Sequence, residues 1–296
     1  GQSIHGKAGP DFKTYRQHYI KAAAVTKKPK TLYNEDYFLK SWEEFLGRET
    51  RIGMISTQNV LSFRQHLNKE KYSSRTINLH VVSLRNMFKL ARTEGYLKHL
   101  PTDGVKQIKV VQTERMLLEP KDIDAICDEA LKNHKRSGEQ FADFIRLMMY
   151  SGGRMTEVLK LKWEDIDWKN QQLVFIGQNT KNGQTRRVDF NAKLKAHLLA
   201  MEAKKSVAYL FPSPRGDKPV TSYKNLLHKI RTDLGLPKFT NHLLRHFFIS
   251  MCVMAGVDYM TIAKWVGHVD GGILIGKVYG HLNSEHTASM AKKVNL

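Results

Sequence analysis

The first hundred residues carry apolar side chains three and four positions apart, which is the period of a helix that buries one face. This pattern predicts a helix over residues 31–46 behind a Thr31 cap, and a second helix over residues 57–67. It is most regular in residues 73–97, where a serine pair can cap the helix and a glycine can end it. The apolar stripe of this third helix consists of Ile77, Val81, Leu84, Phe88 and Ala91. We therefore expect residues 13–105 to fold as a compact helical bundle.

After residue 117 the pattern changes to helical segments interrupted by two strand-like runs. One helix is predicted behind Glu119 and Pro120, and a very apolar helix follows it and ends at Gly152 and Gly153. Two short runs rich in β-forming residues then flank the sequence QNTKNG, whose Asn-Gly pair is typical of a hairpin turn. Four further helices are expected at residues 191–203, 222–233, 242–254 and 258–266. The predicted fold class is mainly α with a small antiparallel β-sheet (α+β).

The change in pattern divides the chain into two domains. We expect a flexible leader over residues 1–12, a helical domain over 13–105, a linker over 106–117 and a larger domain over 118–296. The linker has several cations and few candidate core residues. The end of the chain, residues 283–296, is compatible with a helical tail.

The composition, 41% hydrophobic and 26% charged residues, is that of a globular protein. No apolar run approaches the ~20 residues of a membrane span, and no signal-peptide pattern is present. Cys127 and Cys252 lie far apart and lack C-x-x-C spacing, which argues against a disulfide framework or a zinc ribbon. We therefore expect a cytoplasmic protein with no membrane partner.

The net charge of +20 is the clearest global signal. Residues 1–116 hold 21 basic and 10 acidic residues, and residues 117–296 hold 27 and 18, so the excess is spread over the whole chain. A long polyanion fits this distribution best, with nucleic acid favoured over an anionic membrane.

The common signatures of cofactor and metal enzymes are absent from the sequence. There is no phosphate loop, no dinucleotide-binding glycine motif and no H-E-x-x-H. The histidines lack a metal-ligand spacing, and acidic residues are scarce in the conspicuous motifs. We therefore expect neither a cofactor nor a metal, and any chemistry on nucleic acid must use the protein's own cations.

The helix over residues 73–97 has a polar side rich in cations and amides. The candidate DNA contacts on it are Arg75, Asn78, His80, Arg85 and Lys89. Most charged helical faces contact only water, which is the alternative interpretation. The basic charge of the region favours contact with DNA phosphates or with a groove.

Two motifs in the second domain place cations where they could bind an anion. Arg154 follows a Gly-Gly break at the start of a helix, where backbone amides and a guanidinium group suit a phosphate. Glu157, one turn later, is expected to hold this arginine or the helix start. His242 and Arg245, three residues apart, share one face of another helix. For His246 we predict a structural hydrogen bond.

A third motif, GHVDGGILIGKVYGHL, contains His268 and Tyr279 in one glycine-rich segment. Most tyrosines are packing residues, and a phenol with a pKa near ~10 attacks only if neighbouring groups activate it.

In their order along the chain, these motifs resemble the catalytic domain of the tyrosine recombinases, the family of phage and mobile-element integrases and Xer-type resolvases. The matching residues are Arg154, Lys181 in the T-K-N-G turn, His242, Arg245, His268 and Tyr279. The resemblance covers residues 118–296 and implies a DNA breaking-rejoining fold. The helical region before it looks like the family's SAM-like core-binding domain.

The resemblance implies a role for each arginine and histidine. Arg154 and Arg245 would clamp the non-bridging oxygens of a scissile phosphate and stabilise its pentacoordinate transition state. Either His242 or His268 would hydrogen-bond the phosphate or help to move the proton of the tyrosine.

The resemblance also implies a nucleophile and a leaving-group acid. Tyr279 would form a 3′-phosphotyrosyl bond that stores the energy of the phosphodiester, and nearby positive charge would favour its phenolate. Lys181 would protonate the departing 5′ oxygen. Arg186, on the strand after the hairpin turn, is expected to face DNA or to be structural.

Two departures from the family pattern stand out. Gly153 occupies a position where many members carry an apolar residue. The interval from His268 to Tyr279 is slightly long, which leaves open whether the tyrosine serves its own active site or a neighbour's.

The implied partner is a double-stranded DNA recombination site, bound by a homotetramer that is a monomer or weak dimer when free. The tail is expected to pack on an adjacent protomer. Accessory directionality factors or host factors can take part in the reaction. The enzyme would act at the nucleoid. The short N-terminal region favours work on core sites without an arm-binding domain. A type IB topoisomerase and a catalytically silent DNA-binding architectural protein are the alternatives, and the complete set of catalytic candidates argues against the second. Target sequence, and integrase versus chromosomal resolvase, stay open.

Overall fold

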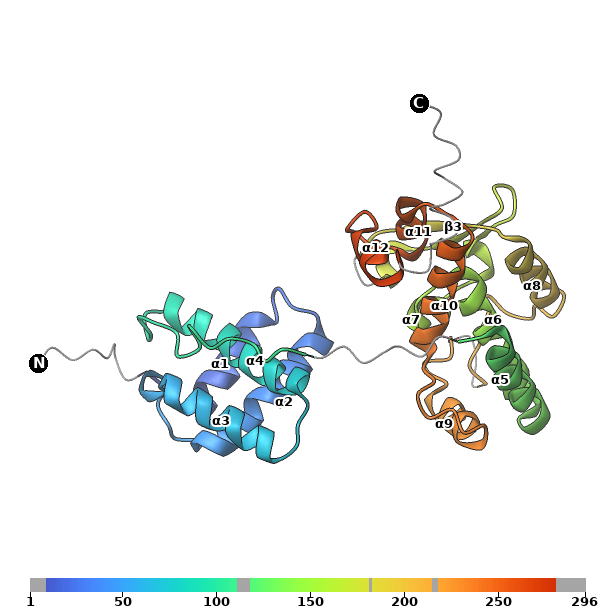
Figure 1. Ribbon diagram of the computed structural model, residues 1–296. Helices are drawn as coiled ribbons and strands as arrows, with labels where there is room; N and C mark the ends of the chain where they lie inside the picture. Colours follow the sequence, from blue (N-terminus) through green and yellow to red (C-terminus); the bar gives the residue numbers. More distant parts are fainter. Residues whose placement is uncertain (1–8, 111–117, 181–182, 215–217, 281–296) are drawn as a thin grey trace, which may run out of the picture. The chain divides into compact units, whose positions relative to one another are not determined.

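The computed structural model describes residues 9–110, 118–180, 183–214 and 218–280, with the backbone alone at 135–136 (Figure 1). The chain divides into two compact units, residues 1–113 and 114–296. The larger hydrophobic clusters each lie within one of these units. Each unit is therefore a separately packed body.

The N-terminal unit is a helical bundle whose helix starts are set by capping residues. Its described helices are α1 (Phe12–Ala23), α2 (Pro29–Leu46), α3 (Thr57–Lys69) and α4 (Ser74–Thr93), with the 3-10 helix η1 (Ile52–Met54) before α3. The side chains of Asp11 and Ser73 accept hydrogen bonds from first-turn amides of α1 and α4 at 2.8 and 3.2 Å. Helix α2 begins at Pro29 and not behind Thr31 as predicted, because proline fits a first turn whose N–H has no helical partner.

The apolar stripe predicted for the third helix is the buried face of α4. Its members Ile77, Val81, Leu84, Phe88 and Ala91 are each at most 6% exposed. The Trp42 ring of α2 packs against Phe63 of α3, with centroids 4.0 Å apart. Burying each large apolar side chain contributes about 1.5–3 kcal/mol, so this contact layer is what holds the helices together. Helical spacing alone thus identified the core of this unit.

The predicted leader and linker both reach too far into the folded unit. Asp11 caps α1 and Phe12 is fully buried, so the leader 1–12 is corrected at its last two residues. The Asn78 side chain accepts the Ile108 N–H at 2.9 Å and donates to the Ile108 carbonyl at 2.8 Å. The chain is therefore still fastened to α4 at a point that we had assigned to the linker 106–117.

The C-terminal unit is mainly helical with one small sheet. Its helices are α5 (Pro120–Asn133), α6 (Lys135–Ser151), α7 (Met155–Val158), α8 (Ala192–Glu202), α9 (Lys224–Asp233), α10 (Asn241–Met254), α11 (Tyr259–Val266) and α12 (Ile273–Tyr279), with the 3-10 helices η2 (Trp163–Asp165) and η3 (Gly177–Asn179). Strands β1 (Ile166–Asp167), β2 (Gln172–Phe175) and β3 (Arg186–Asp189) form an antiparallel sheet in the order β1-β2-β3. Leu173 lies opposite Val188, and both are buried. The predicted fold class is confirmed.

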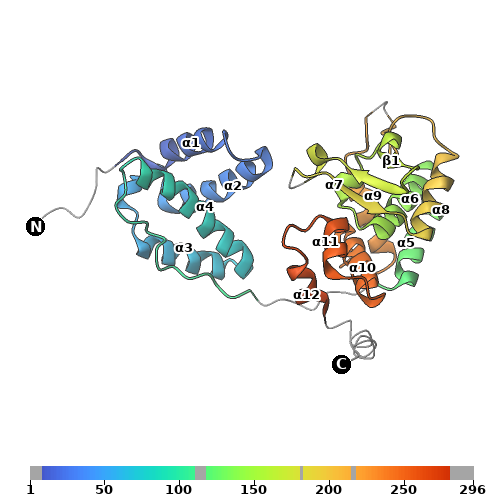
Figure 2. The ribbon, with the colours of Figure 1, turned by 90° about the horizontal axis from the view of Figure 1, so that it is seen from above.

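Helix α6 lies at the centre of the core of this unit. It packs against α5, α8 and α10, and its Phe144 and Leu147 are fully buried. A smaller cluster of buried side chains joins α10, α11 and α12, which lie side by side in Figures 1 and 2. Helix α11 also packs on β3. This packing brings the ends of α6, α10, α11 and α12 into one region.

The two cysteines are free thiols, and the lengths of the described helices bear on whether the chain could cross a membrane. Cys127 is buried and Cys252 half-buried, and burial raises the pKa of each thiol to about 12, so neither is a thiolate at neutral pH. Across the described ranges, no helix combines the length and apolar character that crossing a bilayer requires.

Candidate active site

Arg154 stands at the break between α6 and α7. Helix α6 ends at Gly152, whose φ of 63° lies in the left-handed region that favours glycine. At Gly153 a Cβ atom would lie 2.5 Å from Val158 Cγ2 and 2.8 Å from Phe175 Cζ, so no side chain fits. This crowding explains the glycine at a position where an apolar residue was expected, and it seats the start of α7 against β2.

Glu157 binds two arginines inside the protein. Its carboxylate accepts from Arg154 Nη1 at 3.0 Å and from Arg186 Nη2 at 2.6 Å. It also accepts the backbone N–H of Arg154 at 3.0 Å, so this amide, expected to face a phosphate, is already used. Burial opposes ionisation of Glu157, yet the hydrogen bonds and charges of the two arginines hold the pKa of this carboxyl below its ordinary value. Glu157 thus fixes the arginine and the helix start, as predicted.

Arg186 is a structural member of this buried ion pair. It is 8% exposed, its guanidinium group lies 4.2 Å from the centroid of the Phe175 ring, and its Nε donates to the Trp265 carbonyl at 2.8 Å. Burial lowers its pKa, which the hydrogen bond and charge of Glu157 oppose. Because Arg186 is buried and donates from Nε and Nη2 to acceptors inside the protein, its role is the structural one of the two predicted.

Arg245 is held by main-chain carbonyls at two helix ends. Its Nη1 donates to the Gly152 carbonyl at 2.8 Å and its Nη2 donates to the Val266 carbonyl at 2.5 Å. Burial and the positive charges of Arg154 and Arg186 lower its pKa to about 9, so it remains cationic at neutral pH. This side chain is 2% exposed and therefore fixed in direction by the fold.

The turn after α11 binds the first arginine and carries the second predicted histidine. The Gly267 carbonyl accepts from Arg154 Nη2 at 3.4 Å, and a Cβ at Gly267 would lie 3.0 Å from Arg186 Cδ. The next residue, His268, is half-buried, and burial together with the charges of Arg245 and Arg154 lowers its pKa. Its Nδ1 is buried and has no hydrogen-bond partner among the residues that the structure describes. A neutral imidazole beside two guanidinium groups can therefore accept a further ligand.

Tyr279 ends α12 and reaches α10 of the same chain. The tyrosine is 5% exposed, and its hydroxyl is in hydrogen-bond contact with Nδ1 of His246. The His246 ring in turn meets the His242 ring nearly edge-on, with centroids 4.5 Å apart. The charge of Tyr279 interacts with that of Arg245. The structural hydrogen bond predicted for His246 is thus made to the nucleophile candidate itself, which the sequence pattern did not indicate.

The glycine-rich approach to Tyr279 is shaped by Tyr259. At Gly272, where φ is 97°, a Cβ would lie 2.7 Å from the Tyr259 carbonyl oxygen, and at Gly276 it would lie 3.2 Å from Tyr259 Cε2. Glycines therefore let α12 pack closely on the first residue of α11. The apolar pattern did not predict this helix, because glycine lowers helix propensity and its close packing depends on a partner elsewhere in the chain.

The structure brings five of the six predicted catalytic residues into one region: Arg154, His242, Arg245, His268 and Tyr279. The sixth, Lys181, lies outside the described residues, as does the predicted tail 283–296. Guanidinium groups, imidazoles and a phenol make a site suited to an anion and a nucleophile. Within the described part of the chain, no group of three or more His, Cys, Asp or Glu side chains could hold a metal ion.

Two of the predicted DNA contacts on α4 fasten the segment that follows the bundle. Asn78 makes its two hydrogen bonds to Ile108, and Arg85 Nη2 donates to the carbonyls of Thr102 at 2.9 Å and Val105 at 3.3 Å. Both side chains are only partly exposed. These bonds give both side chains a role in the fold, and their contact with DNA stays a prediction.

His80 lies inside the N-terminal core. It is 2% exposed, and its ring lies 4.6 Å from that of Phe38 and 5.5 Å from that of Phe63. Burial lowers its pKa to about 4, so the ring is neutral at physiological pH. A buried neutral ring cannot reach a phosphate, and this predicted contact is corrected.

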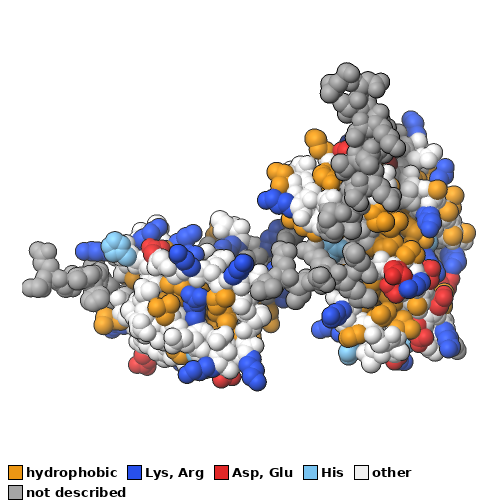
Figure 3. Space-filling view, in the orientation of Figure 1, with side chains coloured by type: hydrophobic (Ala, Val, Ile, Leu, Met, Phe, Trp, Pro, Cys, Tyr) orange, Lys and Arg blue, Asp and Glu red, His pale blue; other side chains and the backbone are white. Residues whose placement is uncertain are grey.

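Arg75 and Lys89 are the exposed members of the predicted set. Figure 3 shows Lys and Arg side chains spread over the visible face of the N-terminal unit, with fewer acidic side chains between them. These two residues therefore stay candidates for phosphate contact.

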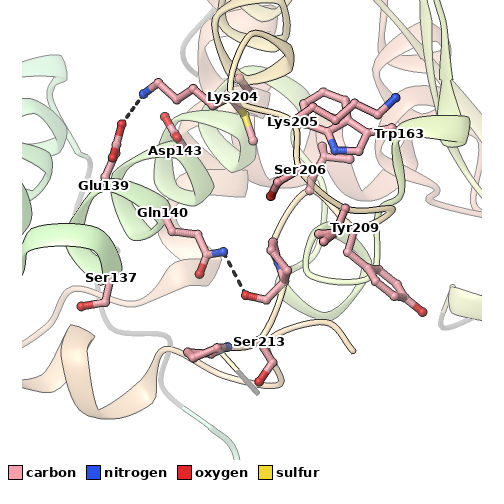
Figure 4. A pocket seen from close by; sticks show the side chains of 15 residues that line it. Ser137, Glu139, Gln140, Asp143, Trp163, Lys204, Lys205, Ser206, Tyr209 and Ser213 are labelled. Carbon is pink, nitrogen blue, oxygen red and sulfur yellow. Dashed lines mark hydrogen bonds and ion pairs between the residues drawn. The ribbon is translucent and has the colours of Figure 1, made fainter. Parts of the chain in front are cut away.

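A cleft of about 500 Å³ in the C-terminal unit contains none of the predicted site residues (Figure 4). It lies between the start of α6, Trp163 and the segment after α8. Gln140 Nε2 donates across it to the Pro212 carbonyl at 3.1 Å, and Lys204 pairs with Glu139 at its edge. The residues that line the cleft are therefore different from those of the cationic site.

Comparison with known families finds matches to both units. A phage integrase family model matches residues 116–286, and a phage integrase SAM-like domain model matches residues 11–109. Among characterised relatives, the tyrosine recombinase XerC of Roseiflexus castenholzii is 26% identical over 259 residues, which are 81% of each chain. The ICEBs1 integrase of Bacillus subtilis is 25% identical over 309 residues, 96% of this chain and 82% of the relative.

Solved structures share the fold. The Tn1549 transposon integrase in complex with a circular intermediate DNA superposes with a TM-score of 0.78 at 15% identity, covering 97% of this chain and 100% of that one. A lambda integrase tetramer bound to a Holliday junction gives a TM-score of 0.75 at 16% identity, covering 93% of this chain and 78% of that one.

Proposed function

The chain belongs to the phage integrase family, whose model matches more than half of it, and we propose that it is a site-specific recombinase that cuts and rejoins DNA through a 3′-phosphotyrosyl intermediate. One observation carries this proposal: Tyr279 contacts α10 beside Arg245, within a cluster of arginines and imidazoles. A phenol in this position is a nucleophile next to groups that bind phosphate.

Arg154 and Arg245 bind the scissile phosphate in this mechanism. Their guanidinium groups donate to its two non-bridging oxygens, which gain negative charge as the pentacoordinate transition state forms. Arg245 is held by carbonyls and Arg154 by Glu157, so neither has to reorganise during the reaction. Removing one such donor costs about 10²- to 10³-fold in rate. The Nδ1 of His268 is buried and has no partner among the described residues, which supports a further hydrogen bond to the substrate once the site is occupied.

Tyr279 attacks the phosphorus, and the bond from phosphorus to the 5′ oxygen breaks. We assign to Lys181 the proton that this oxygen takes up, following the family motif. The phosphotyrosyl linkage keeps the energy of the broken bond, so the 5′ hydroxyl of a second strand can reverse the step without a nucleotide cofactor.

The tyrosine acts in its own active site. Tyr279 contacts His246 of the same chain and lies 5% exposed in the cluster formed by α10, α11 and α12. Delivery to a neighbouring protomer would require α12 to leave this packing. The contact therefore favours attack in cis.

The proposed partner is a double-stranded DNA recombination site, held by a homotetramer that forms on DNA. The net charge of +20 supports DNA binding, and a lambda integrase tetramer of the same fold is known on a Holliday junction. The substrate would be met in the cytoplasm, at the nucleoid, with accessory directionality or host factors where the reaction needs them. The relatives include both the tyrosine recombinase XerC and the ICEBs1 integrase, so a resolvase and an integrase role both fit the chain.

The test is covalent capture. The protein is incubated with a nicked suicide substrate that carries its recombination site, and protein–DNA adducts are separated on a denaturing gel. We expect an adduct with the wild type, none with Tyr279→Phe, and an unchanged amount with Tyr209→Phe, a tyrosine that lines the separate cleft.

The outcomes separate the alternatives. A wild-type protein that binds the site without forming an adduct would be a silent DNA-binding protein. Relaxation of any supercoiled plasmid without site preference would indicate a topoisomerase. An adduct that persists in Tyr279→Phe would remove Tyr279 as the nucleophile.

A further inference from the structure

His246 is the side chain that the structure brings to the hydroxyl of the nucleophile candidate. It lies on α10, one residue after Arg245 and one turn after His242. Its Nδ1 is in hydrogen-bond contact with the Tyr279 hydroxyl, and the two ring centroids are 5.8 Å apart with a tilt of 40°. The contact is therefore made between the hydroxyl and the ring nitrogen, and the two rings are tilted and not stacked.

The direction of this hydrogen bond depends on the tautomer of His246, and a proton transfer to His246 uses the tautomer in which Nδ1 accepts. A phenol always has a proton to donate, and a neutral imidazole has one ring nitrogen that accepts. A cationic imidazole would instead present an N–H and add positive charge beside Arg245. A neutral His246 that accepts at Nδ1 satisfies both groups.

We propose that His246 holds the Tyr279 hydroxyl and accepts its proton during DNA cleavage, an inference that rests on the proposed recombinase function. As the oxygen–phosphorus bond forms, the phenolic O–H bond breaks and its proton moves to Nδ1. The bond from phosphorus to the 5′ oxygen breaks at the same time, and that oxygen takes its proton from a separate donor. In rejoining, the imidazolium returns the proton to the leaving phenolate, so the cycle balances.

The other two histidines occupy different positions in the site. His268 lies with Arg154 and Arg245, whose charges lower its pKa, on the side where the phosphate would bind. His242 is exposed and meets the edge of the His246 ring. The hydrogen-bond contact with the hydroxyl places His246 on the nucleophile side of the reaction.

The experiment measures single-turnover adduct formation on the suicide substrate at saturating enzyme. His246→Leu removes the acceptor, and we expect the rate to fall about 10²- to 10⁴-fold, the usual contribution of a general base. His246→Asn retains an acceptor oxygen near the position of Nδ1 but cannot take up a proton, so its rate should lie between those of wild type and His246→Leu. His228→Leu, an exposed histidine of α9, is the matched control and should react like wild type.

A second substrate separates the nucleophile from the leaving group. Sulfur in place of the bridging 5′ oxygen makes a leaving group that needs no proton. A variant that lacks the leaving-group acid should recover on this substrate, whereas His246→Leu should stay slow. Recovery of His246→Leu on the sulfur substrate would overturn the inference, as would a wild-type rate of His246→Leu on the oxygen substrate.

Folding and binding controls complete the test. Unchanged thermal unfolding and DNA affinity in the two His246 variants, together with the graded rates, support the proton-acceptor role. Equal slowing of both variants with weakened folding would assign His246 to structure alone. Absence of an adduct from the wild type would instead refute the proposed function, which keeps the two failures distinguishable.

Discussion

Glu157 compensates, through its carboxylate, the positive charges of two neighbouring arginines inside the protein. Its side chain is 1% exposed, and its carboxylate meets Arg154 and Arg186 at 3.0 and 2.6 Å. Such a charge is stable in the interior only because both partners are hydrogen-bonded to it. The direction of Arg154, and with it the phosphate clamp, depends on this one carboxylate.

We predict that Glu157→Gln lowers the free energy of unfolding by about 3 kcal/mol at neutral pH, because removing one partner leaves buried charges uncompensated. The pKa of Glu157 is lowered in the folded protein, so its stabilisation is present above the unfolded value of about 4.3. This stabilisation is lost as the pH falls through the folded pKa. Urea unfolding at a series of pH values should therefore show the gap between wild type and variant narrowing below about pH 4.

A matched exposed acid provides the control for this experiment. Glu164 pairs with Lys162 at 3.1 Å, but its side chain is 70% exposed. Glu164→Gln should change stability little, because surface ion pairs are screened by water. A gap for Glu157→Gln that is the same at every pH would refute the electrostatic explanation.

The role of a residue could be predicted where it belongs to a recognisable motif. It was missed where the role depends on a hydrogen-bond or packing partner far away in the sequence. The proposed catalytic residues follow from motif order. The DNA contacts assigned to His80 and Arg186 failed because charge and helical spacing do not reveal which polar side chains find partners inside the protein. Arg186 is bound by Glu157 and Trp265, far away in sequence, and His80 packs as an aromatic ring. His246 was underestimated for the same reason, since its partner lies 33 residues later.

At the scale of elements, α12 is the helix on which the proposed catalysis depends. It delivers Tyr279 at its last residue and packs on α10 and α11. Its start is close to the Tyr259 backbone, and only glycine fits there at a φ of 97°. The position of Tyr279 therefore depends on Gly272, whose neighbour Gly271 also has a positive φ but lies in open space.

Those neighbours allow a paired test. Both Gly271 and Gly272 have positive φ, so alanine at either costs about 1–2 kcal/mol in backbone strain. Only at Gly272 would the new Cβ meet Tyr259, at 2.7 Å, whereas nothing lies within 4 Å at Gly271. We predict that Gly272→Ala displaces α12 and slows adduct formation on the suicide substrate much more than Gly271→Ala does. Equal rates for the two variants would contradict this view of the helix.

The contrast between α4 and α12 explains how much of the fold the sequence could reveal. Helix α4 has a regular apolar stripe whose members are all buried, so local spacing was sufficient. Helix α12 has glycines at its start and in its middle, and it is stabilised by a neighbour that local spacing does not include. The small sheet was foreseen from its hairpin turn, while strand β1, two residues long, was too short to show alternation.

At the scale of the whole molecule, the net charge of +20 governs DNA binding. Each phosphate neutralised by a Lys or Arg releases bound cations, so the logarithm of affinity falls with that of salt by about 0.9 per contact. The exposed side chains of Arg75 and Lys89 are candidates for such contacts.

We predict that Arg75→Ala and Lys89→Ala each weaken binding to any DNA sequence and reduce the salt slope by about 0.9. Asn78→Ala, on the same helix, should leave the slope unchanged and lower stability, because Asn78 is uncharged and binds Ile108. Fluorescence anisotropy with labelled duplex at several salt concentrations measures both quantities. A slope unaffected by either cation would exclude that residue from the DNA interface.

The arginines of the site are oriented largely by the main chain. The carbonyls of Gly152 and Val266 hold Arg245, that of Trp265 holds Arg186, and that of Gly267 accepts from Arg154. These carbonyl oxygens do not titrate. They belong to the backbone, so their presence does not depend on which side chain each residue carries. However, Val266 is fully buried and Trp265 packs on the core, so replacing either side chain would disturb the path of α11 that positions them. The orientation of Arg245 is therefore a property of the backbone, and a change that shifts the end of α6 or of α11 will disturb it even when no proposed catalytic side chain is replaced.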